Sequence, residues 1–287
     1  MARNREKKIS LNHQIKLVMD SQLAIGQSKF DDKLNNQTKN KIYSWSTYRT
    51  YLKHNIYFVE WAKKNYNIKS LDEGKKYVNE WLEFREKEGL SSYTLKLESS
   101  ALVKLYNLDS SSLYKVKNRA RNDIQRSRGE KIRDTHFSEK NNEELVTFCK
   151  STGLRRCELS QIRGTDLFFK GKTPFLKVSR NTKGGRVRNV PLVINTELIV
   201  QLLEKAGENK LFSKISSNAD IHGYRGDFAK NLYKLYARDI NNIPKEDRYH
   251  CRKDLKGICY DKKAMKIVTE ALGHSRIDVI AGHYISK

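Results

Sequence analysis

The stretch that decides the fold is Thr152-Gly153-Leu154-Arg155-Arg156-Cys157-Glu158-Leu159. The residues before it, 143–150, carry apolar side chains at helical spacing, and Gly153 is the residue type that ends a helix in the left-handed conformation. Arg155 therefore stands at a corner between two predicted helices. A guanidinium fixed there suits a phosphate, because its planar fork of five donors matches phosphate oxygens better than an ammonium group does. The octapeptide alone is equally compatible with a surface arginine between two core helices.

The composition indicates a polyanionic partner. The chain has 57 Lys+Arg against 33 Asp+Glu, which gives a formal net charge of +24. Such an excess costs self-repulsion in a compact fold and favours nucleic acid as the partner, with an anionic membrane surface as the alternative. The sequence has no apolar run of roughly 18 residues and no signal-peptide pattern at its start, so we expect a cytoplasmic protein that does not enter the membrane.

The four cysteines, at positions 149, 157, 251 and 259, contain no C-x-x-C pair. We expect them to be buried thiols in a reducing compartment. A metal site built from His250, Cys251 and Cys259 is the alternative, but this spacing fits no common zinc pattern. The prediction is therefore that the protein binds no metal.

The first half of the chain is predicted to be all-helical. Apolar side chains recur at helical spacing within residues 46–62, 71–88 and 93–105. Aromatic residues are frequent, from Tyr43 to Trp61. We expect most of them to pack in a core, with base stacking as the alternative, because many fall at core spacing.

A basic segment follows this helical module. Between Lys115 and Arg133 the chain has eight basic residues and only two acidic ones. A solvated helix normally mixes both signs, so this composition favours a strap that follows DNA phosphates. The residues expected to bind DNA are Lys115, Lys117, Arg119, Arg121, Arg126 and Arg128.

Gly129 and the polar residues after it mark a boundary between two domains. Residues 1–40 are predicted to be an N-terminal arm that orders on a partner. Residues 41–128 form a helical DNA-binding domain, residues 129–138 a linker and residues 139–287 a second domain. A chain of 287 residues is long enough for two cores. The expected fold class is mainly α with a small β-hairpin or sheet in the C-terminal domain, hence α+β.

The second half carries polar residues at the ends of its predicted elements. Residues 174–180 and 186–192 alternate as strands do, and the glycines between them favour a hairpin with Lys183 at its tip. His222 and Arg225 are neighbours on the first turn of a predicted helix. A further helix, 262–272, ends at Gly273. His274 follows it directly, and a last short helix carries Tyr284.

These pieces, in this order, resemble the catalytic domain of tyrosine recombinases, the integrase family that shares its chemistry with type IB topoisomerases. The resemblance covers about residues 145–287, and the basic, helical first half is similar in kind to that family's core-binding domain. The matching motifs are Thr-Gly-Leu-Arg155-x-x-Glu158-Leu, Lys183 before Val-Pro-Leu, His222-x-x-Arg225, Leu-Gly-His274 and Tyr284.

Residue by residue, the resemblance implies that Tyr284 is the nucleophile and that Arg155 and Arg225 hold the scissile phosphate. The chemistry of these groups agrees with such roles. A phenol with a pKa of about 10 is a poor nucleophile until its proton is removed, and a phosphodiester repels anions. Two arginines that neutralise the developing charge would then be the main catalytic contribution. Glu158, one turn from Arg155, can orient or buffer that guanidinium.

The resemblance further implies that Lys183 protonates the leaving 5' oxygen and that His222 and His274 assist in proton transfer or hydrogen bonding. No cofactor is predicted, and the sequence has no acidic cluster of the kind that a two-metal nuclease requires. The spacing from His274 to Tyr284 is ten residues, one more than is commonest in the family. We therefore expect the last helix to carry a bulge or to start differently. Only residues 285–287 follow the tyrosine, so subunit contacts are expected not to depend on a C-terminal tail.

The predicted function is a site-specific DNA recombinase or integrase that cuts and rejoins duplex DNA through a covalent 3'-phosphotyrosyl intermediate, and integrates or excises a mobile element. The alternatives are a resolvase that monomerises replicons, a type IB topoisomerase-like strand transferase, and a catalytically silent DNA-binding protein of the same fold. The silent protein is disfavoured because all the catalytic residue types are present. The expected partners are double-stranded DNA, further copies of the chain assembled on DNA as a dimer to tetramer, and an accessory DNA-bending factor.

Overall fold

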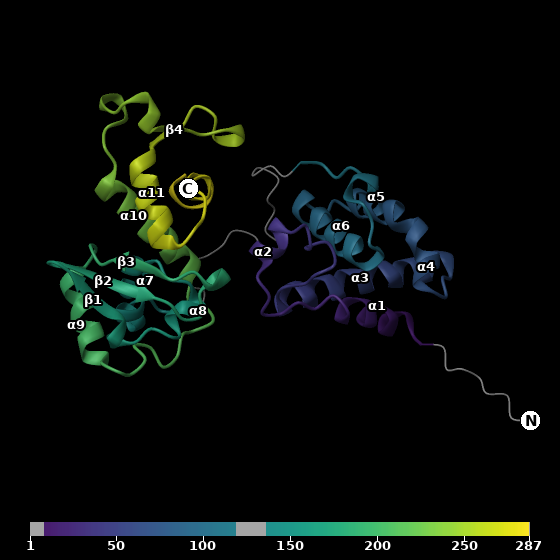
Figure 1. Cartoon of the computed structure of the whole chain (residues 1–287), viewed down its shortest axis with the longest axis horizontal. Helices are drawn as coiled ribbons and strands as arrows, with labels where there is room; N and C mark the ends of the chain where they lie inside the picture. The colour runs from purple at the N-terminus through teal and green to yellow at the C-terminus, as the bar shows by residue number, and fades with distance from the viewer. Residues whose placement is uncertain (1–8, 119–135, 287) are drawn as a thin grey trace, which may run out of the picture. The chain divides into compact units, whose positions relative to one another are not determined.

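The computed structural model of the chain describes residues 9–118 and 136–286. The chain divides into two compact units, Met1–Gly129 and Glu130–Lys287, each with its own hydrophobic core. In Figure 1 the first unit is coloured purple to blue and the second green to yellow. Helices dominate both units, and the strands lie in the second. The predicted α+β class, mainly helical with a small sheet, is confirmed.

The N-terminal unit is built from helices, most of which are preceded by a capping serine, although α5 follows Tyr77 without a side-chain cap. Each of these serines precedes a helix and accepts a backbone N–H bond with its side-chain oxygen, as an N-cap does: Ser10, Ser28, Ser44, Ser70 and Ser91. The helices are α1 (Leu11–Asp20), α2 (Lys29–Leu34), α3 (Trp45–Tyr66), α4 (Leu71–Gly74), α5 (Val78–Lys87) and α6 (Ser92–Tyr106), with 3-10 turns at Lys75–Tyr77 and Ser110–Ser112.

The core of this unit forms around Phe58 on α3, which is fully buried. The rings of Trp81 and Tyr106 stand edge-on to Phe58, with centroids 6.1 and 6.0 Å away. These contacts place this part of the aromatic set in the core, as expected. Residues 11–20, assigned to an arm in the sequence analysis, instead form α1, because Ile15 and Met19 lie one turn apart and are fully buried in the same core.

The C-terminal unit begins with a helix that ends at the corner predicted from the sequence. The helix α7 (Glu143–Thr152) packs against α10 (Ile221–Tyr236), and Gly153 caps it with φ of 58°. A Cβ atom on Gly153 would lie 2.3 Å from the ring of Phe228, so only glycine lets the two helices approach this closely. The other helices are α8 (Arg156–Leu159), α9 (Thr196–Ala206), α11 (Lys262–Leu272) and α12 (Asp278–Ile280), with a π-helical turn at Ala281–Ile285.

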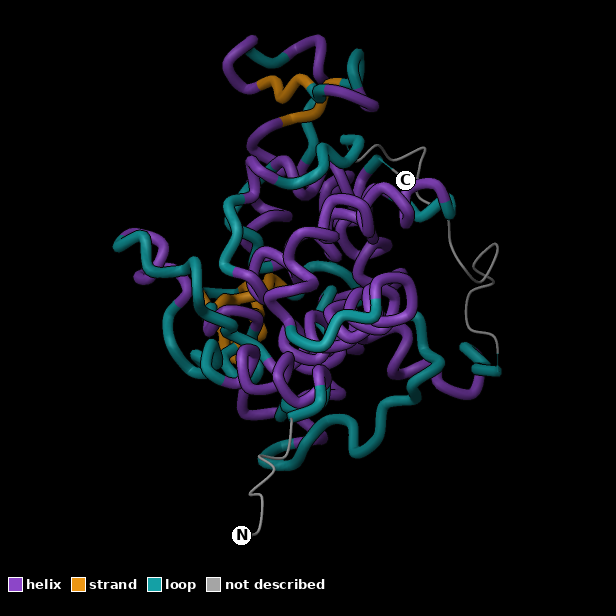
Figure 2. Tube along the Cα trace, turned by 90° about the vertical axis from the view of Figure 1, so that its right-hand side faces the viewer, coloured by secondary structure: helices purple, strands orange, loops and turns teal. Residues whose placement is uncertain are grey.

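Two small sheets complete the unit. The three-stranded antiparallel sheet has the order β1 (Leu167–Lys170), β2 (Thr173–Val178) and β3 (Arg188–Pro191). The predicted hairpin is therefore present, with a further strand beside it. A second pair, β4 (Arg248–His250) and β5 (Cys259–Asp261), connects α10 to α11 and lies apart from the first sheet in Figure 2. The sequence analysis did not foresee this pair, because three-residue strands are too short to show a period.

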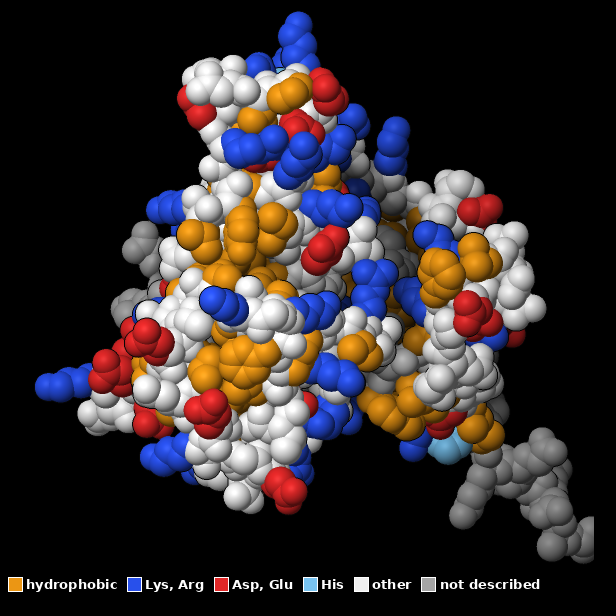
Figure 3. Space-filling view, turned by 60° about the vertical axis from the view of Figure 1, so that its left-hand side comes forward, with side chains coloured by type: hydrophobic (Ala, Val, Ile, Leu, Met, Phe, Trp, Pro, Cys, Tyr) orange, Lys and Arg blue, Asp and Glu red, His pale blue; other side chains and the backbone are white. Residues whose placement is uncertain are grey.

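The 3-10 turns of this unit are short connectors, at Lys140–Asn142, Gly164–Asp166, Lys183–Gly185, Ile240–Asn242, Lys245–Asp247 and Lys253–Leu255. Lys and Arg side chains are distributed over the face shown in Figure 3, with hydrophobic side chains reaching the surface between them. Among the described residues, no helix combines the length and the apolar composition needed to cross a bilayer.

Candidate active site

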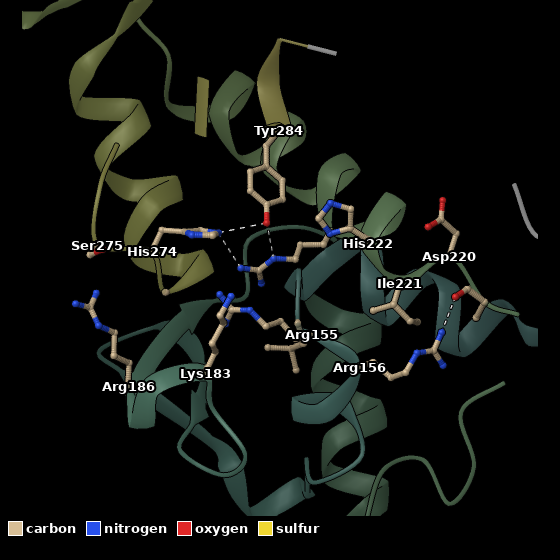
Figure 4. Close-up of a pocket in the computed structure, with 14 residues that line it drawn as sticks. Arg155, Arg156, Lys183, Arg186, Asp220, Ile221, His222, His274, Ser275 and Tyr284 are labelled. Atoms are coloured by element: carbon tan, nitrogen blue, oxygen red, sulfur yellow. Dashed lines mark hydrogen bonds between the residues drawn. The ribbon is translucent and has the colours of Figure 1, made fainter. Parts of the chain in front are cut away.

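A cleft of about 690 Å³ opens in the C-terminal unit where α8, α10, α11 and the π-helical turn meet. Figure 4 shows the side chains that line it. All the residues predicted to be catalytic are among them: Arg155, Lys183, His222, Arg225, His274 and Tyr284. The structure thus brings together six positions that are spread over 130 residues of sequence.

Arg155 is held by Glu158, which lies one helical turn further along the chain. It precedes α8 in extended conformation, and its backbone N–H donates to Glu158 Oε2 at 2.8 Å. Its Nη1 donates to Glu158 Oε1, also at 2.8 Å, and its Nη2 lies 3.4 Å from the carbonyl oxygen of Leu272. The short helix α8 therefore fixes both the backbone and the guanidinium of Arg155, as expected for an orienting Glu158.

Arg225 is almost fully buried at the first turns of α10, with 2% of its surface exposed. Its guanidinium donates to the carbonyl oxygens of Gly153 and Leu272, the latter at 2.6 Å. Its Nε donates to the hydroxyl of Tyr284 at 3.2 Å. Burial lowers the pKa of Arg225 to about 10, so the group remains a cation at neutral pH.

Tyr284 reaches this cluster from the π-helical turn Ala281–Ile285 and is buried. A π-helical turn takes up one more residue per turn than an α-helix does. The bulge expected from the ten-residue spacing between His274 and Tyr284 is therefore present. It turns the phenol inward, so that its hydroxyl lies 3.3 Å from His274 Nε2.

His274 follows the end of α11 at once. Gly273 adopts φ of 67°, and the N–H of His274 donates back to the carbonyl of Thr269 at 2.9 Å, which fixes the turn. Its Nε2 is 3.3 Å from Arg225 Nη2. Because a guanidinium can only donate, this contact requires an unprotonated Nε2. Burial, followed by the positive charge of Arg225 and Arg155, lowers the pKa of His274 to about 4, so the imidazole is neutral at pH 7.

Lys183 and His222 form the more open side of the cleft. Lys183 is exposed at the tip of the β2–β3 hairpin, in a turn that needs Gly184 at φ of 75°. His222 is exposed at the start of α10, and its ring centroid lies 5.8 Å from that of Tyr284. Both side chains face the space beside Tyr284 in Figure 4.

The sequence analysis did not single out Arg156 and Arg186, which line the cleft, or Arg188, which lies outside its lining. Arg156 donates to the carbonyl oxygens of Ser216 and Ala219 and so holds the loop before α10. Arg188, on β3, is buried and binds both oxygens of Glu158, at 2.9 and 2.7 Å. A sequence signal existed for Arg188: strand alternation puts it on the same face as the buried Val190, where a charge needs a partner.

Glu158 is fully buried and shared by Arg155 and Arg188. Burial alone would raise its pKa. The hydrogen bonds and charge of Arg188, together with those of Arg155, outweigh the effect of burial and lower the pKa of Glu158 to about 2. The carboxylate is therefore ionised throughout the physiological range, and it is a fixed negative charge between two cations.

The predicted DNA-binding strap lies only partly within the described residues. Lys115 and Lys117 are exposed, whereas Arg119, Arg121, Arg126 and Arg128 lie outside the described residues. Lys115 lines a groove of about 1030 Å³ in the N-terminal unit. The other described cations of this groove are also lysines: Lys29, Lys39, Lys41, Lys96 and Lys104.

The cysteines depart in part from expectation. Cys149 and Cys251 are buried and Cys259 is half-buried, but Cys157 is exposed. The prediction was wrong for Cys157 because the single turn of α8 directs Glu158 and Leu159 inward and leaves their neighbour outside. His250 pairs with Cys259 across β4 and β5. No group of three or more metal-ligating side chains occurs within residues 9–118 and 136–286.

Comparison with known proteins finds likeness in structure. No family model matches the chain, and no curated protein sequence matches it. The XerH site-specific recombinase, solved in a post-cleavage complex with a palindromic difH substrate, is 18% identical with a TM-score of 0.49, over 94% of this chain and 90% of that one. The Tn1549 transposon integrase, in complex with circular intermediate DNA, is 13% identical with a TM-score of 0.48, over 96% and 95%. The XerA recombinase is 14% identical with a TM-score of 0.31, over 96% and 94%. These solved structures are of recombinases and an integrase, the class of protein that the sequence motifs resemble.

Proposed function

We propose that the chain is a site-specific DNA recombinase of the tyrosine recombinase type, which cuts and rejoins duplex DNA through a covalent 3'-phosphotyrosyl intermediate. The observation that carries this proposal is the position of the Tyr284 hydroxyl. It lies 3.2 Å from Arg225 Nε and 3.3 Å from His274 Nε2, in a cleft whose other charged walls include Arg155 and Lys183. A phenol, a neutral imidazole and several cations in one cleft suit attack on a phosphodiester.

The two arginines act on the phosphate. Arg225 is fixed by backbone carbonyls and Arg155 by Glu158, so neither guanidinium has to reorganise when charge develops on the non-bridging oxygens. Arg155 keeps 19% of its side chain exposed, with donors that Glu158 does not take. In a partly buried cleft, such preorganised donors stabilise the transition state more than the same groups do in water.

Proton transfer divides between two groups. His274 accepts the phenolic proton as the Tyr284 oxygen forms its bond to phosphorus, because its Nε2 faces the guanidinium of Arg225 unprotonated and lies 3.3 Å from the hydroxyl. Lys183 gives a proton to the 5' oxygen as the P–O bond breaks. His222 donates a hydrogen bond to the phosphate. Rejoining reverses these steps, with a 5' hydroxyl as the nucleophile. One P–O bond forms for each that breaks, so the reaction needs no cofactor.

Duplex DNA is the partner that this chemistry and the net charge of +24 support. Copies of the chain would assemble on DNA as a dimer to tetramer, because recombination joins strands from two cleaved sites. We place the enzyme with the integrating or excising recombinases of mobile elements, with an accessory DNA-bending factor as a further partner and the cytoplasm as its location.

A topoisomerase-like strand transferase is the alternative with the same chemistry, because a cleaved strand held by Tyr284 can also rotate before rejoining. Supercoiled plasmid separates the two functions. A recombinase should leave plasmids without its target site supercoiled, whereas relaxation of any plasmid would establish the topoisomerase activity instead.

The proposal is tested by trapping the covalent intermediate. On a nicked duplex carrying the target site, the short fragment with the new 5' hydroxyl diffuses away after cleavage, and wild-type protein should accumulate an adduct that resists SDS. Tyr284→Phe lacks only the hydroxyl and should form none. Tyr260→Phe is the matched control, because Tyr260 lies on β5 with its ring against Tyr233, 5.6 Å between centroids, and not in the cleft. An adduct that survives in Tyr284→Phe would overturn the assignment.

A further inference from the structure

Arg188 is a buried arginine for which the proposed mechanism has no direct use. Its Nη1 and Nη2 donate to the two oxygens of Glu158 at 2.9 and 2.7 Å, and its Nε donates to the carbonyl oxygen of Ala271 at 2.8 Å. Only 8% of its surface is exposed. The nitrogens of Arg225 are engaged as well, but Arg225 lines the cleft and Arg188 does not. Arg188 is therefore not placed to bind phosphate, so its contribution must pass through the groups that it holds.

We propose that Arg188 is the positioning residue of the cleft, which holds Arg155 in place through Glu158 and holds His274 in place through the end of α11. This inference rests on the proposed function, because it assigns Arg155 and His274 to the reacting phosphate and tyrosine.

The first link runs through Glu158, whose oxygens each accept from both arginines. Oε1 accepts from Nη1 of Arg155 and Nη1 of Arg188, at 2.8 and 2.9 Å. Oε2 accepts from the backbone N–H of Arg155 and from Nη2 of Arg188, at 2.8 and 2.7 Å. Without Arg188, a fully buried carboxylate would have a single cation to balance it, and it would draw Arg155 away from the phosphate. Arg188 therefore leaves Arg155 free to face the cleft.

The second link runs through the C-terminal end of α11. The last carbonyls of a helix have no partner within it and carry partial negative charge. Here they are bound by arginines: Ala271 by Arg188, and Leu272 by Arg225 at 2.6 Å and by Arg155 at 3.4 Å. Three guanidiniums thus hold one helix end, directly before the turn that presents His274.

Close packing between Gly273 and Arg188 strengthens the link to the end of α11. A Cβ atom on Gly273 would lie 2.9 Å from Cδ of Arg188, closer than such atoms approach in proteins. The aliphatic part of Arg188 therefore fills the place where any other residue would put its side chain. Arg188 is also the first residue of β3, three positions after the turn Lys183–Gly185, and it anchors the base of the hairpin that carries Lys183.

The opposite end of α11 offers a matched ion pair outside the cleft. Asp261 caps the helix and is fully buried, and Arg238 binds both of its oxygens at 2.8 Å through Nε and Nη2. Like Glu158, Asp261 is a buried carboxylate held by an arginine. Arg238→Met therefore matches Arg188→Met in the kind of interaction removed, and differs in its distance from the chemistry.

The experiment compares these variants on two suicide substrates, one with the natural scissile phosphodiester and one with an uncharged methylphosphonate in its place. Adduct formation is followed in single turnovers at saturating protein, below the unfolding temperature of each variant. On the phosphodiester we expect Arg188→Met to be slower than wild type by about 100-fold, as for the removal of one charged group that stabilises the transition state. On the methylphosphonate, which needs less charge neutralisation, the defect should shrink at least tenfold. Arg188→Lys should be intermediate.

Arg238→Met should show the same rate ratio to wild type on both substrates, because a purely structural defect does not depend on the charge of the phosphate. An Arg188→Met variant that retains the wild-type rate, or that is slowed by the same factor on both substrates, would overturn the inference. If neither Arg188 variant folds, the double variant Glu158→Gln with Arg188→Met takes their place in the same comparison. This double variant leaves no unbalanced buried charge.

A second readout needs no activity and separates this inference from the proposed function. In the free protein, the imidazole resonances of His274 should shift in Arg188→Met and remain in place in Arg238→Met, because Arg238 binds Asp261 at the opposite end of α11. Wild-type protein that forms no adduct on any DNA would overturn the recombinase proposal. An unmoved His274 resonance in Arg188→Met would overturn the positioning role whether or not the wild type cleaves DNA.

Discussion

The groove of the N-terminal unit and the cleft of the C-terminal unit are both basic, but they use different cations. Every described basic residue that lines the groove is a lysine, and the described strap residues Lys115 and Lys117 are exposed. Of the described cations that line the cleft, Lys183 alone is not an arginine, and Arg225 is buried with each of its nitrogens bonded. An ammonium group attracts a phosphate backbone as a point charge without fixing its geometry, whereas a planar guanidinium held by several partners does fix it. Under the proposed function, this difference would separate affinity for DNA from chemistry on it.

The largest effect that separates the two regions is expected within the cleft. Arg155→Ala should slow adduct formation by roughly 100- to 1000-fold, because it removes charge stabilisation in the transition state. Lys183→Ala should also be slow on ordinary DNA, but a 5'-bridging phosphorothiolate should restore most of its rate, because a thiolate leaves without a proton. The same sulfur should not help Arg155→Ala. Equal rescue of both variants, or of neither, would withdraw Lys183 as the acid.

A smaller effect is expected in the groove, and on affinity alone. Replacing Lys115 and Lys117 by alanine should flatten the log–log salt dependence of DNA binding by about 0.9 for each phosphate that the variant no longer neutralises. The rate at saturating protein should stay as in the wild type. Lys63→Ala with Lys64→Ala removes the same charge at the end of α3, outside the groove, and serves as the control. Equal slopes for the two double variants would mean that Lys115, which lines the groove, and Lys117, which lies beyond it, do not contact phosphates. The same approach extends to Arg119, Arg121, Arg126 and Arg128.

The smallest effect concerns the proton on His274. Its pKa is lowered to about 4 in the folded protein, against an ordinary value of about 6.5. Between these two pKa values His274 is protonated in the unfolded chain but neutral in the folded protein. Its contribution to the free energy of unfolding is therefore complete above about pH 6.5 and is lost as the pH falls towards 4. Imidazole NMR of the free protein should show His274 titrating near pH 4. Titration near 6.5 would contradict the lowered pKa and the loss of stability between pH 6.5 and 4 that follows from it.

The residues that line the cleft were easier to recognise in the sequence than Arg188, which holds them in place. Arg155, Arg225 and His274 stand in local patterns, at a helix end, on a helix face and after a glycine stop, and such patterns can be read within a few residues. The role of Tyr284 was assigned only through the family resemblance. Arg188 acts across the fold. Its partners Glu158 and Ala271 are 30 and 83 positions away, a separation that no local period reports. The strand pattern could show only that Arg188 faces inward.

The same limit explains the fold-level differences. The long helices were predictable because the spacing of apolar residues identifies both the helix and the face that it buries. For α1, Leu11, Ile15, Val18 and Met19 stand at helical spacing, but the place of this helix in the core was not predictable, because the helices that bury Ile15 and Met19 lie further along the chain. Strands β4 and β5 exist through pairing with each other and are too short to be recognised alone.

The π-helical turn at Ala281–Ile285 has a consequence for how such a site can change over generations. An inserted codon in a regular helix rotates everything beyond it by about 100°. Here one turn absorbs the added residue locally, so the phenol of Tyr284 still meets Arg225 and His274. This last turn therefore tolerates an insertion that would otherwise move the phenol out of the cleft. Once the wider turn is in place, removing a single residue between positions 275 and 281 becomes the damaging event, because it would turn the phenol away from Arg225 and His274.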